Sequence, residues 1–485
     1  MTFNSLEFLI FYPIVALLYF VLPRRAVWPM LLVASYYFYM CYQAELVVLI
    51  AGTTLISWLA SHAIKRTERK SVKKLWLTLA LVVCFGVLFF YKYFNFLSGT
   101  VTGLINLCGG QVSRFELDLL LPVGISFYTF QTLSYVIDVY RGDVLPERNF
   151  FFYALFVSFF PQLVAGPIER PGNLMPQLRE RHPWSNENAV KGAKHMIVGF
   201  FKKICVADLI AVYVNSVYNN VESASALGVI IATALFAVQI YCDFSGYTDI
   251  AIGCARVMGI RLMKNFDHPY MATGIKEFWA RWHISLSGWF KDYLYIPLGG
   301  NRRGKARAML NVFIVFLVSG LWHGANWTFV LWGAIHGLYQ VVGTLTRRPR
   351  DIFWERVGLG KDSGLLRWLR RAGTFVLVSF AWIFFRANSI EDAFAVIGKL
   401  FGGWNIGISD TLSALGLTLV PILTVIFSMG LLIMIDKMLH YDDTPDSSGV
   451  LVRRGAFIYF AWAIILGWLL LLSGGTLSTF IYFQF

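Results

Sequence analysis

Residues 265–337 read NFDHPYMATGIKEFWARWHISLSGWFKDYLYIPLGGNRRGKARAMLNVFIVFLVSGLWHGANWTFVLWGAIHG and place two histidines among tryptophans. His283 stands in WARWHISLSGWF, a block of Trp, Arg and Lys that is too charged to face lipid. His323 ends an apolar run, residues 308–321, that spans about half the width of a membrane or slightly more. Gly-Ala-Asn follows, and a second apolar run covers residues 327–345. The pattern predicts two hydrophobic helices with His323 at the break between them.

An imidazole at such a break is costly unless it is buried in protein or faces a wet cavity. Membrane proteins place polar chemistry at broken helices near mid-depth. A histidine can also serve simply as a hydrogen-bonding contact across a helix junction. The position of His323 leaves both interpretations open.

The composition indicates a polytopic membrane protein. Of 485 residues, 57% are hydrophobic and only 14% are charged, whereas soluble domains carry roughly a quarter charged residues. No low-complexity tract or 20–50-residue repeat divides the chain, so we expect one membrane domain over residues 1–485. The first apolar run, residues 6–22, lacks a basic n-region and a small-residue cleavage site, and we interpret it as a retained span.

The net charge of +14 indicates loops that face the cytoplasm and anionic lipid, rather than nucleic acid. The six cysteines show no CxxC pair and no zinc spacing. We therefore expect neither a disulfide framework nor a metal site.

Spans of about 20 apolar residues cross a bilayer, and the chain has about 11–13 candidate transmembrane or re-entrant helices of this kind. The candidates are residues 6–22, 27–42, 46–64, 75–97, 119–139, 196–215, 227–251, 308–322, 326–345, 373–386, 415–435 and 455–473. The run 150–168 is broken by Pro161, Gly166 and Pro167, which is compatible with a re-entrant segment. The wider segment 140–203 is too polar to cross as a whole, and we expect it at the cytoplasmic face as short helices and turns.

Basic clusters predict the orientation, because Lys and Arg collect in cytoplasmic loops. Clusters at residues 24–25, 65–74, 302–307, 347–350, 367–371 and 453–454 are expected on that side. The N-terminus and residues 98–118 then lie outside.

Charged residues also occur inside apolar segments. Asp243 and Asp249 stand in QIYCDFSGYTDIAIG, where carboxylates must face the bundle interior and find partners. A functional role and an internal salt bridge both remain open for them. Lys202 and Lys203 are interpreted as snorkelling lysines at a membrane interface.

Five segments together resemble the membrane-bound O-acyltransferase (MBOAT) family, and within it the membrane subunits of bacterial polysaccharide acetylation, of the alginate O-acetyltransferase type. The segments are SFYTFQTLSYVIDVYRG (126–142), FPQLVAGPIER (160–170), YCDFSGYTDIAIG (241–253), FWARWHISLSGWFKDYLYIPLGGNRRG (278–304) and SGLWHGANWTFVLWGAIHG (319–337). The D-alanyl transferases of teichoic acid modification and the peptidoglycan acetylation subunits share this pattern.

The resemblance implies a multi-pass protein of the bacterial inner membrane, with a ring of tilted helices around a central tunnel. It places the family's essential histidine on His323 and its second histidine on His283. The reaction it implies moves an acyl group, expected to be acetyl, from a cytoplasmic thioester towards a hydroxyl outside. The donor is acetyl-CoA or an acylated carrier protein.

A thioester is activated enough to need no metal, but the attacking hydroxyl needs a base, which a histidine supplies. We expect His323 to be that base and His283 to position the donor or acceptor. Trp322 and Asn326 would shape the site. Asp243 and Trp282 are further candidates for the substrate tunnel.

The terminal FIYFQF (480–485) resembles the aromatic C-terminal motif of the small partner in D-alanylation systems. By that resemblance Tyr482 would carry the acyl group and pass it to a separate extracytoplasmic SGNH-like transferase with a Ser-His-Asp site. A plain membrane anchor is the alternative for this tail.

Two other functions stay open from the sequence. A transporter for a lipid-linked sugar would use Asp243 and Asp249, although no inverted repeat is evident. A lipid or sterol acceptor would keep the acyl transfer but change the product.

Overall fold

The fold is known from a computed structural model that describes residues 1–360, 363–442, 455–472 and 480. Within these residues the secondary structure is helical, apart from one isolated bridge between Phe266 and Trp282. The prediction of an all-α chain is confirmed.

The α-helices are α1 (Leu6–Val21), α2 (Arg24–Met40), α3 (Val47–Arg66), α4 (Lys70–Leu88), α5 (Phe94–Leu107), α6 (Ile125–Arg141), α7 (Phe150–Ser158), α8 (Phe160–Leu163), α9 (Pro171–Arg179), α10 (Asn186–Phe200), α11 (Leu209–Tyr218), α12 (Ala226–Val257), α13 (Ile275–Arg281), α14 (Ile284–Phe290), α15 (Lys305–His323), α16 (Trp327–Leu345), α17 (Arg347–Arg356), α18 (Gly364–Arg386), α19 (Ile390–Gly402), α20 (Ile408–Ala414), α21 (Leu419–Asp442) and α22 (Gly455–Leu472). Three short π-helices adjoin them, η2 (Phe89–Tyr93), η3 (Phe201–Asp208) and η6 (Lys291–Tyr295), and three 3₁₀ turns complete the set, η1 (Ala44–Leu46), η4 (Val221–Ser223) and η5 (Pro269–Met271).

The described helices make this a multi-pass membrane protein. Six are long and apolar enough to cross a bilayer, and the bent pair α20 and α21 raises the number to seven if it counts as one span. The six are 44–66, 70–107, 226–257, 305–323, 327–345 and 364–386. The helix α1 is apolar but shorter. Each candidate span of the sequence overlaps one or more described helices. How many of the 11–13 expected helices cross the membrane stays a prediction.

The chain divides into two compact units. The first comprises residues 1–193 and 251–367, and the second comprises residues 194–250 and 368–485. Both histidine motifs lie in the first unit, and Asp243 and Asp249 lie in the second.

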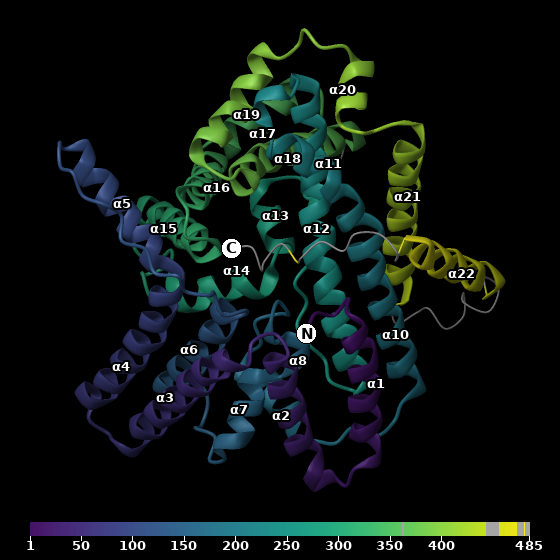
Figure 1. The fold of residues 1–485 in the computed structure, drawn as a ribbon. Coiled ribbons are helices and arrows are strands. Elements are labelled where there is room, and N and C mark those ends of the chain that lie inside the picture. Colours follow the sequence, from purple (N-terminus) through teal and green to yellow (C-terminus); the bar gives the residue numbers. More distant parts are fainter. Residues whose placement is uncertain (361–362, 443–454, 473–479, 481–485) are drawn as a thin grey trace. The chain divides into compact units, whose positions relative to one another are not determined.

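In the first unit, α3 packs against α4 and α6, and α2 packs against α7 (Figure 1). Nearly every side chain of α6 is buried, because its aromatic and hydroxyl residues meet protein on all sides. The helix begins at Gly124, whose φ of 74° is left-handed and where a Cβ would approach the Leu163 carbonyl to 2.7 Å.

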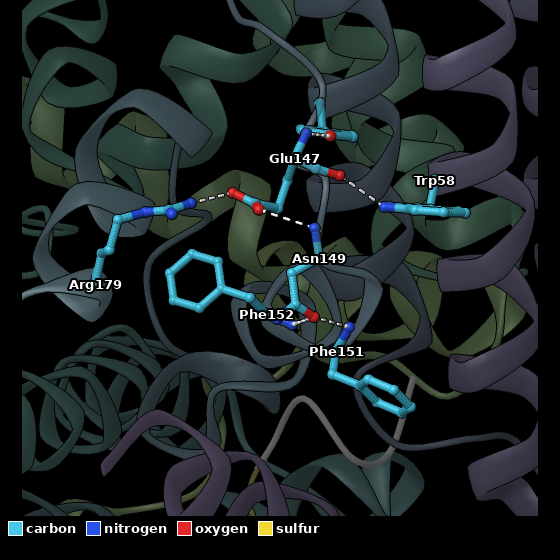
Figure 2. A network of polar contacts seen from close by, with 7 residues as sticks. Trp58, Glu147, Asn149, Phe151, Phe152 and Arg179 are labelled. Carbon is cyan, nitrogen blue, oxygen red and sulfur yellow. Dashed lines mark hydrogen bonds and ion pairs between the residues drawn. The ribbon is translucent and has the colours of Figure 1, made fainter. Parts of the chain in front are cut away.

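A network of hydrogen bonds and an ion pair holds the loop before α7 (Figure 2). The carbonyl of Glu147 accepts a hydrogen bond from Trp58 Nε1 (2.7 Å), and its carboxylate pairs with Arg179. The Asn149 side chain caps α7 by accepting from the backbone of Phe151 and Phe152. The loop therefore joins α3, α7 and α9.

The break expected in residues 150–168 is present. The helix α7 ends at Ser158, and α8 restarts with Pro161 in its first turn, where proline is tolerated. The backbone N–H of Phe160 donates to Ser35 Oγ (3.1 Å), so a side chain satisfies this buried helix end.

Candidate active site

The helices α15 and α16 form a closely packed antiparallel hairpin (Figure 1). Gly320 and Gly333 allow the approach, since a Cβ on Gly320 would lie 2.3 Å from the Phe329 carbonyl and one on Gly333 would lie 2.4 Å from the Phe316 carbonyl. Asn326 caps α16 by accepting from the backbone N–H of Thr328 at 3.0 Å. The predicted break is confirmed, with His323 as the last residue of α15.

His323 is buried at this break among aromatic rings. Its imidazole lies edge-on to Trp322, with ring centroids 4.9 Å apart, and to Trp332, at 5.0 Å. Since α16 carries Trp332, the hairpin itself supplies one of the rings that contact the imidazole.

His283 meets His323 from a different segment. Their ring centroids are 6.5 Å apart, and both side chains are buried. His283 separates α13 from α14 in a left-handed backbone conformation, with φ 45° and ψ 55°. Strain of this kind in a residue other than glycine persists only where the surroundings impose it, and it clusters at functional sites.

The Trp322 ring contacts both histidine rings. Its ring lies 6.0 Å from that of His283 and 5.4 Å from those of Phe127 and Phe130. The indole Nε1 is buried and donates to no acceptor in the described part of the chain. An interaction of this N–H with a substrate stays a prediction.

Two residues that sequence reasoning missed hold the end of α15. Lys92 Nζ donates to the carbonyls of Trp322 (2.8 Å) and His323 (2.9 Å), and Tyr93 Oη donates to the carbonyl of Leu321 (2.7 Å). Both come from the π-helix η2. The sequence feature that could have identified Lys92 is its place inside the apolar run 75–97, where an ionisable residue indicates function.

A third buried histidine, also missed, lies nearby. Trp279 Nε1 donates to His336 Nδ1 at 3.1 Å, and the His336 ring lies 5.0 Å from that of Trp332. Because an indole nitrogen only donates, Nδ1 must be the acceptor, which leaves the proton of the neutral ring on Nε2. His336 lies one helical turn after Trp332 on α16 and extends the group of buried histidine and tryptophan rings around His323.

Trp282 lies within an aromatic group. Its ring stacks on Phe278 (5.4 Å) and meets Phe266 edge-on (5.1 Å). A place for Trp282 in a substrate tunnel stays a prediction.

Asp243 and Asp249, both in the second unit, are paired with lysines. Asp243 lies 2.6 Å from Lys203 Nζ, which also binds Asp208 at 2.9 Å, and Asp249 lies 2.9 Å from Lys202 Nζ. The interpretation of the two lysines as snorkelling residues was wrong. Both side chains are buried, because the π-helix η3 packs them towards carboxylates on α12 rather than towards a membrane surface. The expected partners of Asp243 and Asp249 are these lysines.

The tail is described at one position. Phe480 is buried and stacks on Tyr247 of α12, with ring centroids 4.8 Å apart. Tyr482 lies outside the described residues.

Glu169, outside the spans, is the buried carboxyl of the segment AGPIER. Burial raises its pKa to about 7, although it accepts hydrogen bonds from Met263 N (2.5 Å) and Asn173 Nδ2 (2.7 Å). Among the described residues, no group of three or more His, Cys, Asp and Glu side chains has the arrangement of a metal site.

Two buried histidines thus meet at the break of an apolar helical hairpin in a multi-pass membrane protein. The chain belongs to the membrane-bound O-acyltransferase family, whose model matches residues 145–359. The enzyme class and the resemblance are thereby confirmed.

Its relatives include a peptidoglycan O-acetyltransferase and several probable alginate O-acetylases. The chain is 36% identical over 505 residues, covering both chains fully, to the probable alginate O-acetylase AlgI of Pseudomonas putida. It is 39% identical to that of Pseudomonas aeruginosa over 84% of this chain and 76% of the relative. It is 35% identical to the peptidoglycan O-acetyltransferase of Helicobacter pylori over 82% of this chain and 80% of the relative.

Proposed function

We propose that the protein is a membrane O-acetyltransferase that moves acetyl from a cytoplasmic thioester across the bacterial inner membrane, for O-acetylation of an extracytoplasmic alginate-like polysaccharide. The meeting of His283 and His323, with ring centroids 6.5 Å apart at the end of α15, carries the proposal. The similarity to alginate O-acetylases supports the polymer and the acetyl group.

His323 acts as the general base. One ring nitrogen takes the proton of the acceptor hydroxyl while the oxygen attacks the thioester carbonyl. The C–S bond then breaks, and the sulfur leaves as a thiol after it receives a proton from the imidazolium. Such proton transfer contributes about 10²–10⁴-fold to the rate. His283, from a different segment, positions the donor or the acceptor.

The burial of the two histidines serves this chemistry. A thioester in water is open to hydrolysis, and a site that excludes water limits that side reaction. The Trp322 indole N–H supplies a hydrogen bond to the carbonyl oxygen as negative charge develops on it. Asn326, at the start of α16, shapes the same end of the hairpin.

The acceptor and the path outward are further parts of the proposal. Tyr482 receives the acetyl group and delivers it to an extracytoplasmic SGNH-like transferase, which acetylates the polymer. The donor is acetyl-CoA. The chain is also 35% identical to a peptidoglycan O-acetyltransferase. Peptidoglycan is therefore the second candidate acceptor.

The ion pairs of Asp243 and Asp249 bear on the transporter alternative. Asp243 and Asp249 each lie within 2.9 Å of a lysine nitrogen, which favours a structural role for them over the binding of a transported ion. An acyltransferase needs no gradient, so thioester consumption by the protein in detergent separates the two functions.

The test uses the purified wild type, His323→Ala and Tyr482→Phe, each incubated with acetyl-CoA. Free thiol is measured, and the C-terminal peptide is analysed by mass spectrometry. Thiol release that is lost in His323→Ala, with acetyl on Tyr482, supports the proposal. Release without a modified tyrosine leaves an enzyme with no tyrosine relay. No release, even with a carrier-protein donor and the outer transferase added, contradicts the proposal.

A further inference from the structure

The end of α15 is held from outside the hairpin by a lysine side chain. Lys92 Nζ lies 2.8 Å from the Trp322 carbonyl and 2.9 Å from the His323 carbonyl, and 3.4 Å from Ser126 Oγ. These are among the last carbonyls of the helix, which lack intrahelical donors. A cation that binds them also complements the negative end of the helix dipole.

The π-helix η2 makes this reach possible. A π-helical turn inserts an extra residue into a helix, and such bulges occur often at functional sites. Here the turn separates α4 from α5 and carries both Lys92 and Tyr93. Since Tyr93 Oη binds the preceding carbonyl, that of Leu321, at 2.7 Å, three successive carbonyls of α15 are held by two adjacent residues.

The contacts of Lys92 define its role. Three acceptors lie within 3.4 Å of its Nζ, namely Ser126 Oγ and the carbonyls of Trp322 and His323. The nitrogen is therefore engaged in binding the helix end and does not face a substrate carbonyl as a nucleophile. We propose that Lys92, supported by Tyr93, is a positioning residue that fixes the terminus of α15 so that the His323 imidazole is held in register with His283.

This inference rests on the proposed function, in which His323 is the base. A base misplaced by about 1 Å costs about 10²-fold in rate. Lys92→Met removes the donors and keeps an unbranched side chain. We expect it to lower kcat by about 10²-fold, while KM for acetyl-CoA stays within about twofold, because Lys92 does not bind the donor.

Lys92→Arg retains donors for two carbonyls, so its kcat should lie between those of the wild type and Lys92→Met. Tyr93→Phe, which removes one hydrogen bond, should lower kcat less than Lys92→Met does. The matched control is Lys74→Met, which removes an exposed lysine from α4 and should match the wild type.

A double substitution separates positioning from general damage. If Lys92 acts through His323, Lys92→Met should change the residual rate of His323→Ala by no more than about twofold, because coupled residues are not additive. An equal loss in both backgrounds would overturn the inference, as would a wild-type kcat in Lys92→Met. If Lys92→Met does not fold, unchanged kcat in both Lys92→Arg and Tyr93→Phe overturns it.

Hydrogen exchange gives a readout that does not depend on activity. In Lys92→Met, the amides of residues 321–325 should exchange faster than in Lys74→Met, because the helix end opens locally. If the wild type releases no thiol, the proposed function fails with this donor, and exchange alone decides the inference. Faster exchange would then support the contact as a clamp on the helix end, and unchanged exchange would overturn it.

Discussion

The imidazole rings of His283 and His323 lie 6.5 Å apart, and each belongs to a helix terminus. His283 precedes α14 in a left-handed conformation, and His323 is the last residue of α15. Neither histidine lies in the interior of a regular helix, so regular helical geometry alone does not position its ring. The packing of the hairpin and the contacts at its end therefore decide whether the two histidines meet.

The close approach of α15 and α16 leads to a prediction on glycine. Alanine usually stabilises a helix interior by about 0.8–1.0 kcal/mol relative to glycine. Gly333→Ala should do the opposite, because its Cβ would meet the Phe316 carbonyl at 2.4 Å, and overpacking costs about 1–3 kcal/mol. Thermal unfolding in detergent and kcat should both fall. Gly343→Ala, on the same helix with nothing within 4 Å, is the control. Equal effects of the two substitutions would contradict the packing argument.

Lys203 should be important for stability. Its ammonium group lies between Asp243 (2.6 Å) and Asp208 (2.9 Å) in a buried site. Lys203→Met leaves two carboxylates without this cation and should destabilise the fold by about 3–5 kcal/mol. Lys191→Met removes a more exposed pair with Glu187 and should cost no more than about 1 kcal/mol. Thermal unfolding compares them, and a similar small loss for both would show that Lys203 is not essential to the fold.

Glu169 should make stability depend on pH. Burial raises its pKa from 4.5 to about 7, so the folded state favours the protonated carboxyl. The free energy of unfolding that the protonated carboxyl contributes is fully present below about pH 4.5 and is lost as the pH rises through about 7. The loss amounts to on the order of 3 kcal/mol.

Glu169→Gln stays neutral, so its melting temperature should fall less than that of the wild type between pH 5 and 8, as measured by thermal unfolding. Glu180→Gln, an exposed control, should follow the wild type. Parallel curves for all three proteins would be inconsistent with a buried carboxyl that titrates near neutrality.

The helices and the hairpin break were predictable because both are encoded locally. Apolar length gives the spans, and the Gly-Ala-Asn sequence after His323 gives the break. The need of Asp243 and Asp249 for partners also followed from their setting, since carboxylates in an apolar segment require compensation.

The pairings between distant segments were not predictable. Periodicity does not reveal that Lys92 reaches the carbonyls of α15, or that Trp279 donates to His336. The error on Lys202 and Lys203 has the same origin. A lysine beside an apolar run fits an interface as well as an ion pair, and only the three-dimensional packing of η3 against α12 decides between them.

The most direct test of the central claim compares a single turnover of acetyl-CoA in the wild type and in His323→Ala, with donor binding measured on the same samples. If His323 is the base, His323→Ala should bind the donor as the wild type does, while thiol release slows by about 10²–10⁴-fold. Thiol release at the wild-type rate in His323→Ala would contradict the account, because the chemistry would then proceed without the imidazole at the end of α15.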